Sequence, residues 1–225
     1  DLIYSGTTSG FAENNITKIY KNINNGCEFV EVPTSIPAII YGNIEWIDVN
    51  NDGLLDVFYQ GLNKKEEYDS GIFKNNGDET FTKIENTSFY IINGDRANAQ
   101  FNRAKWADLD GDGLKDVITA SSTKTEREFA IYKNLGNFKF EKTNFSLPLL
   151  SYISMDVGDI NNDKLADLVF TGSSKFDMIS GDTGTKLYFY INKGNMNFTN
   201  SFTMNNDGVL LSKIKLGDFN NDGFP

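Results

Sequence analysis

The feature that most constrains the fold of this chain is an acidic nine-residue pattern that returns four times in phase. Its fullest copy runs from Asp108 to Asp116 and reads DLDGDGLKD. Further copies begin at Asp48, Asp159 and Asp218, and the last of them runs out at Pro225, one residue before its ninth position. Because self-similarity at a regular period is the signature of a repeat architecture, each copy has to be interpreted together with the segments around it.

Strand-like segments flank every copy of the acidic pattern. Apolar residues stand two and four places before its first aspartate, and this period of two indicates strands with one buried face. The pairs are Ile44 and Trp46, Ala104 and Trp106, Met155 and Val157, and Ile214 and Leu216. A short β-prone run such as VFYQG follows the ninth position, and the chain itself opens with a run of this kind after Asp1.

A second repeated motif predicts a hairpin in each repeat. An aromatic strand runs into Asn and Gly and resumes with Phe, at 19–29, 72–81, 131–140 and 189–198. This is typical of two antiparallel strands joined by a glycine-containing loop. Each repeat therefore contains about four short strands, in a period of the length expected for a propeller blade.

Four antiparallel strands per repeat predict an all-β fold, namely a β-propeller built of four-stranded antiparallel blades. Counted from the ninth position, the repeats span approximately 1–55, 56–115, 116–166 and 167–225 of a single propeller domain. Four repeats are compatible with a closed four-blade ring or with part of a larger propeller, for example a seven-bladed one. A two-sheet sandwich of duplicated hairpins is the alternative fold, but a sandwich does not require the whole pattern to recur in phase.

Composition limits the chemistry of the acidic loops. The chain has no His and one cysteine, Cys27, so imidazole ligands and a thiolate zinc site are excluded. Any metal must be held by oxygen, which favours a hard cation such as Ca²⁺. The net charge of −10 argues against nucleic acid or an anionic membrane as the main partner. No apolar run approaches the roughly 18 residues that a membrane span needs.

The spacing of the acidic pattern suits Ca²⁺. Side-chain oxygens at positions 1, 3, 5 and 9 and a carbonyl at position 7 can surround one ion, which takes six to eight oxygens at about 2.3–2.6 Å. Tyr59, Thr119 and Phe170 stand at position 12, where an EF-hand requires Glu, so these loops are not EF-hands. Carboxylates crowded in this way repel one another without a cation. We therefore expect three to four structural Ca²⁺ ions.

The four loops are not equivalent. The loop at Asp108 carries four aspartates and is expected to bind most tightly, whereas the loop at Asp48 has Asn50 at position 3 and one charge less. Lys164 replaces the glycine found at position 6 elsewhere, so it must adopt a positive φ or distort its loop. We predict that this third site is the weakest or remains empty. If the ring closes, a last inner strand at about 212–218 would complete the first blade and Asp1 would supply the missing ninth ligand.

The two motifs together resemble the FG-GAP/VCBS repeats of integrin-α-like β-propellers over essentially the whole chain. The resemblance implies that each calcium loop joins the innermost strand of a blade to the second strand, with the inner strands ending at Asp48, Asp108, Asp159 and Asp218. The chain departs from the family at Lys164, and its four repeats are fewer than the usual seven blades. The ligands implied by the resemblance are Asp48, Asn50, Asp52, Leu54 and Asp56; Asp108, Asp110, Asp112, Leu114 and Asp116; Asp159, Asn161, Asp163, Leu165 and Asp167; and Asp218, Asn220, Asp222 and Phe224 with Asp1, the seventh-position residues contributing a carbonyl.

These observations predict a calcium-stabilised recognition or scaffold module that is secreted or located at the cell surface, since weak calcium sites of about 10⁻⁴–10⁻³ M are typical of extracellular modules. Its partner would be a protein or glycan bound on the face opposite the calcium loops. There Phe89, Tyr90 and Arg96 are of types enriched at binding hot spots, although the two aromatics could equally cover a blade edge.

Two other functions stay open, and the sequence identifies no catalytic residue. One is a carbohydrate-active lyase or hydrolase, and the other is a spacer within a larger surface adhesin. An enzyme would need a constellation among the ionisable residues of the opposite-face loops. These are Glu66, Glu67, Asp69, Asp95, Arg96, Asp177 and Asp182, and nothing in the sequence groups them.

Overall fold

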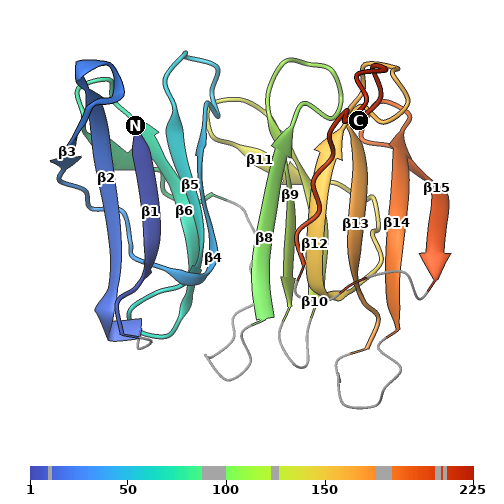
Figure 1. The fold of residues 1–225 in the computed structure, drawn as a ribbon, viewed down its shortest axis with the longest axis horizontal. Coiled ribbons are helices and arrows are strands. Elements are labelled where there is room, and N and C mark those ends of the chain that lie inside the picture. The colour runs from blue at the N-terminus through green and yellow to red at the C-terminus, as the bar shows by residue number, and fades with distance from the viewer. Residues whose placement is uncertain (10–11, 88–99, 123–126, 176–183, 206–208, 210–211) are drawn as a thin grey trace.

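The computed structural model describes the chain except for residues 10–11, 88–99, 123–126, 176–183, 206–208 and 210–211. Within the described residues the fold is all-β, in four antiparallel sheets that stand side by side with the arrangement of propeller blades (Figure 1). This confirms the predicted fold class. No helix in the described part of the chain is long and apolar enough to cross a membrane.

The sheets follow the chain in order, each as a meander of neighbouring strands. The first sheet has three strands, β1 (Leu2–Thr7), β2 (Asn15–Ile23) and β3 (Glu28–Val32), with short 3₁₀ turns at Ala12–Asn14 (η1) and Asn24–Gly26 (η2). The second contains β4 (Ile40–Ile47), β5 (Asp56–Leu62), β6 (Tyr68–Asn75) and β7 (Phe81–Lys83). The third contains β8 (Gln100–Ala107), β9 (Asp116–Ser122), β10 (Arg127–Asn134) and β11 (Phe140–Lys142), and the fourth β12 (Ser151–Gly158), β13 (Asp167–Ser173), β14 (Thr185–Asn192) and β15 (Phe198–Asn205).

The apolar core lies between neighbouring sheets. Phe58 and Ile72 of the second sheet pack with Tyr132 of the third, while Ile131 of the third packs with Phe170 of the fourth. All residues of β5 and of β13 are buried. These second strands are covered on both faces, which explains why runs such as VFYQG show no polar alternation.

The inner strands β4, β8 and β12 share an irregularity that the sequence does not reveal. Their pairing with the second strand shifts register between Ile40 and Asn43, between Gln100 and Arg103, and between Ser151 and Ser154. Within the first bulge Tyr41 has φ 52°, and a Cβ on Gly42 would lie 1.8 Å from the carbonyl oxygen of Gln60. Glycine is therefore required at this close approach.

The segment 212–218, predicted as a last inner strand, forms no strand in this structure and lies beside β12. The Ile214 N–H donates to Ser154 Oγ at 2.8 Å, and the Leu216 N–H donates to Asp156 Oδ2 at 2.9 Å. A strand needs a backbone ladder, and these contacts with side chains supply none. The N- and C-terminal residues lie in different parts of the row of sheets (Figure 1), so the described residues do not form a closed ring.

Candidate metal centre

All four acidic loops share one internal hydrogen-bond pattern. The first aspartate accepts the N–H of position 6 on Oδ2, from Gly53, Gly113, Lys164 and Gly223 at 3.0, 2.9, 2.7 and 2.8 Å. The fifth-position aspartate accepts the N–H of position 7, from Leu54, Leu114, Leu165 and Phe224, at 2.9–3.0 Å. The repeated sequence thus produces four loops of the same local shape.

The ninth-position aspartates Asp56, Asp116 and Asp167 are fully buried where the loop enters the second strand. Each accepts one N–H from position 2 of its own loop and one from an asparagine at the end of the third strand. For Asp116 these donors are Leu109 and Asn134, both at 2.8 Å. Burial disfavours the charged form and raises the pKa of Asp116 to about 6, and it raises the pKa of Asp56 and Asp167 as well.

The loop with the most aspartates forms the tightest acidic cluster. Carboxylate oxygens of Asp108, Asp110 and Asp116 lie within 4.8 Å of one another. This separation suits three ligands around one Ca²⁺ at about 2.3–2.6 Å from each oxygen. Among the described residues this is the one such group of three or more His, Cys, Asp or Glu side chains. The donor set therefore fits a hard cation.

Lysines reach the first two loops from the third strand. The Lys133 ammonium contacts Asp110 and lies 3.2 Å from Asp112, and Lys74 lies 3.6 Å from Asp52. Hydrogen bonding to Asp110 raises the pKa of Lys133. A positive charge therefore already lies beside these carboxylates, as their repulsion requires. The sequence analysis overlooked these lysines, although both precede the asparagine of the hairpin motif.

Lys164 keeps the loop shape by adopting the left-handed backbone conformation. Its φ is 72°, close to the 85° of Gly53 and the 89° of Gly113. Of the two outcomes expected from the sequence, the positive φ is the one observed. The strain of a non-glycine residue in this region is retained in the loop, and the weaker binding expected there stays a prediction.

Asp1 has the hydrogen bond of a ninth-position residue but does not meet the fourth loop. Its Oδ1 accepts the Asn22 N–H at 2.8 Å, as Asp116 accepts that of Asn134. The loop beginning at Asp218 lies at the C-terminal end of the row of sheets, where segment 212–218 is hydrogen-bonded to β12 (Figure 1). In this structure the first sheet therefore does not supply the ninth ligand of the fourth loop.

Two asparagines of the hairpin motif, Asn134 and Asn192, connect one sheet to the next. Asn134 Nδ2 donates to the carbonyl of Val49 in the preceding acidic loop at 2.8 Å and to that of Lys115 at 3.0 Å. Asn192 makes the equivalent bonds to Leu109 and Ala166 at 2.8 and 3.0 Å. Sequence reasoning took these residues as turn formers only. Asparagine recurs in phase at positions 22, 75, 134 and 192, and this recurrence was the signal that the residue does more than form a turn.

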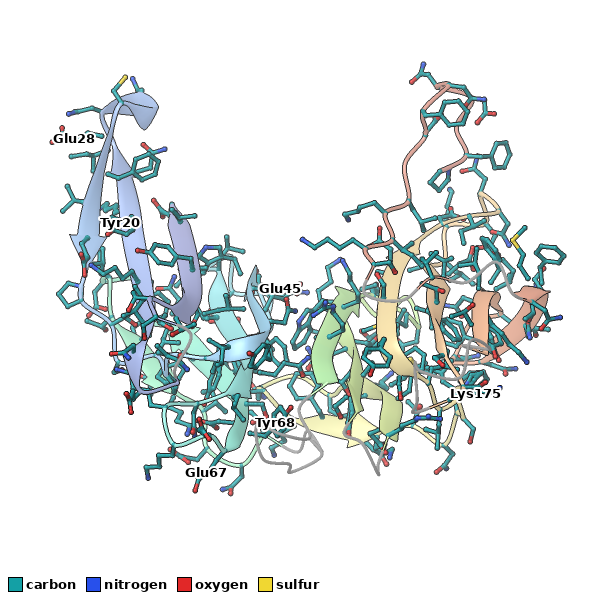
Figure 2. The ribbon with its side chains drawn as sticks, turned by 60° about the horizontal axis from the view of Figure 1, so that its bottom comes forward. Tyr20, Glu28, Glu45, Glu67, Tyr68 and Lys175 are labelled. Atoms are coloured by element: carbon teal, nitrogen blue, oxygen red, sulfur yellow. The ribbon has the colours of Figure 1, made fainter. Side chains whose placement is uncertain are left out.

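The opposite face carries the turn from Asn63 to Glu67, with Asp69 already in strand β6, and a groove of 490 Å³ between the first two sheets. Its lining includes Lys18, Thr34, Lys64, Lys65 and Asp69. Figure 2 places Glu67 and Tyr68 near this side of the molecule, away from Glu28 on the β2–β3 hairpin. Phe89, Tyr90, Asp95, Arg96, Asp177 and Asp182 lie outside the described residues.

The blades and their acidic loops define this chain as a repeat protein of the β-propeller type. A model of the FG-GAP-like repeat matches residues 48–119 and 108–170, which together cover more than half of the chain. The chain therefore belongs to the FG-GAP-like repeat family. A comparison with curated proteins gave no match.

Proposed function

We propose that this protein is a calcium-stabilised recognition or scaffold module that acts outside the cell, as an integrin-like β-propeller. The observation that carries the proposal is the cluster of Asp108, Asp110 and Asp116, whose carboxylate oxygens lie within 4.8 Å on a loop between two strands. The three related loops repeat its internal hydrogen bonds. Family membership supports the proposal because FG-GAP-like repeats resemble extracellular propeller modules.

Bound calcium would stabilise the junction between strands. In the second loop, Asp108, Asp110, Asp112 and Asp116 and the carbonyl of Leu114 would hold the ion, which would supply the positive charge that Lys133 supplies in part. The four loops and Asp1 contain 13 of the 31 acidic residues. Carboxylates crowded in this way repel one another, so a cation in each loop is expected to oppose that repulsion directly.

A protein or glycan ligand is proposed for the face opposite the acidic loops. The groove beside Lys64, Lys65 and Asp69 supports this because it combines charged groups with the hydroxyl of Thr34 and has a volume of 490 Å³. This volume lies within the range of about 300–1,000 Å³ that is typical of ligand sites. No described set of residues favours catalysis over binding.

Thermal unfolding with calcium and with excess chelator, together with a metal count, tests the calcium proposal. Calcium at about 100 times its dissociation constant is expected to add about 2.7 kcal/mol per site to the free energy of unfolding. Asp110→Asn should lower the ion count and the shift, whereas Glu141→Gln, which removes the same charge from an exposed position on β11, should preserve both. An unchanged melting temperature and no bound metal in the wild-type chain would contradict the proposal.

A further inference from the structure

A cavity of 330 Å³ lies between the inner strands, and four of its eleven lining residues are positively charged. β8 contributes Arg103 and Lys105, and the C-terminal segment contributes Lys213 and Lys215. Glu45 on β4 is the acidic residue of the lining, and Figure 2 shows it on the side of β4 toward β8. We propose that this cavity binds a small oxyanion ligand, one that carries a carboxylate or sulfate group on a molecule of about the size of one sugar ring.

Among the described residues, the lysines at the cavity outnumber the carboxylates that lie beside them. Asp156 on β12 is 3.0 Å from the Lys105 ammonium and 3.3 Å from that of Lys215, so one carboxylate is shared by two lysines. Lys213 adds a further charge to the lining, and Arg103 adds a guanidinium group. Among the described residues the three lysines of the lining outnumber the two carboxylates of Glu45 and Asp156, in a chain whose net charge is −10. An anionic ligand would complete this balance.

The repeated bulges place the lining residues. In each inner strand, regular pairing resumes at the same repeat position, which is Asn43 in β4, Arg103 in β8 and Ser154 in β12. All three of these residues line the cavity. Bulges are common beside functional sites because they redirect a side chain from the regular pleat. The same irregularity in three successive strands thus assembles one site.

The uncharged groups of the site also favour an oxyanion. The Nδ2 group of Asn43 is buried and has no hydrogen-bond partner among the described groups. An unpaired buried donor is unfavourable and calls for an acceptor. Guanidinium and ammonium groups bind oxyanions through short, charge-assisted hydrogen bonds. The volume lies at the lower end of the range for small-molecule pockets, which favours a small ligand over an extended polymer.

Titration calorimetry on the folded 225-residue chain tests the inference, with sodium glucuronate and sodium sulfate as probes at low ionic strength. Glucose is the uncharged control for glucuronate. We expect both anions to bind, glucose not to bind, and affinity to fall as salt is added. The double variant Arg103→Gln/Lys213→Gln should bind at least about tenfold more weakly, because it loses two charged donors.

The matched control is Lys83→Gln/Lys139→Gln, which removes two positive charges from exposed positions on β7 and the β10–β11 hairpin. It should retain the wild-type affinity. Equal weakening in both double variants would show general attraction to positive charge and would overturn the inference. The inference would also be overturned if neither anion bound, or if the acidic polymer hexaglutamate bound and the two small anions did not. The calcium-dependent unfolding shift is measured separately, so a failure here is distinguishable from a failure of the proposed function.

Discussion

Replacing Asn134 by alanine tests whether the hairpin asparagine holds neighbouring sheets together. Its side chain donates to the carbonyls of Val49 at 2.8 Å and Lys115 at 3.0 Å, and it accepts the Gly136 N–H at 2.9 Å. Asn134 and Val49 are both completely buried, so water does not replace the lost bond to Val49. A hydrogen bond contributes about 1 kcal/mol net, and a buried group left unpaired costs about 1–3 kcal/mol. Asn134→Ala should therefore lower the free energy of unfolding by about 3–5 kcal/mol.

The same position in the second sheet provides the control. Asn75 donates to the Leu55 carbonyl at 3.0 Å and accepts the Gly77 N–H at 2.9 Å, and no bond from its side chain to a neighbouring sheet is found among the described residues. Leu55 is 52% exposed, so water can replace part of what is lost. Asn75→Ala should cost about 1–2 kcal/mol.

Urea-induced unfolding measures the stability of both variants. The transition is monitored by tryptophan fluorescence and by circular dichroism, to check that the two probes give coincident curves. At equal m-values, the difference in midpoint gives the difference in stability. Asn192→Ala should match Asn134→Ala, because Asn192 bonds Leu109 in the preceding loop in the same way. If Asn134→Ala and Asn75→Ala cost the same within about 0.5 kcal/mol, the bond between sheets contributes nothing and the reasoning fails.

Three further substitutions test the loops and the inner strands. Lys164→Gly relieves the strain of a non-glycine residue at φ 72° and removes a positive charge. It should tighten calcium binding in the third loop and raise stability by up to about 1 kcal/mol. An unchanged calcium titration would count against this. Lys133→Met removes the ammonium beside Asp110 and Asp112, so it should lower stability in chelator yet tighten calcium binding about fivefold. An unchanged calcium affinity would show that the lysine does not compete with the ion. Gly42→Ala would bring a Cβ to 1.8 Å from the Gln60 carbonyl oxygen and should lower the stability measured by thermal unfolding by about 3 kcal/mol or more. Gly6→Ala, whose added Cβ would have nothing within 4 Å, should cost far less stability. Similar losses in the two variants would refute the close approach.

The local elements could be predicted from the sequence because their signals are local. The alternation before Asp48 and Asp108 marks the inner strands, and the Asn-Gly loops mark the outer hairpins. The positive φ of Lys164 was one of two outcomes anticipated from its neighbours in the other repeats. In each case the residue pattern itself carries the constraint, with no need for a distant partner.

Features that depend on packing could not be predicted in this way. The bulge at Tyr41 depends on the close approach of Gly42 to β5, and the strand at 212–218 was expected from its pattern although no backbone ladder forms there. Charged residues at or beside the inner cavity do recur in phase, since Glu45, Lys105, Asp156 and Lys215 each stand three residues before an acidic loop. The period was therefore visible, but their meeting in one place depends on how the sheets are arranged.

The second position of the first acidic loop, Val49, explains why metal binding and sheet packing should be coupled. The Val49 N–H donates to Asp56 within its own sheet, and its carbonyl accepts from Asn134 of the next sheet. Its side chain is fully buried in the core that these two sheets share. A cation that fixes Asp56 would therefore also fix the backbone group to which the next sheet is attached. It follows that calcium should stabilise the contact between sheets as well as its own hairpin, and that Asn134→Ala should reduce the calcium-dependent rise in melting temperature even though Asn134 is no predicted metal ligand.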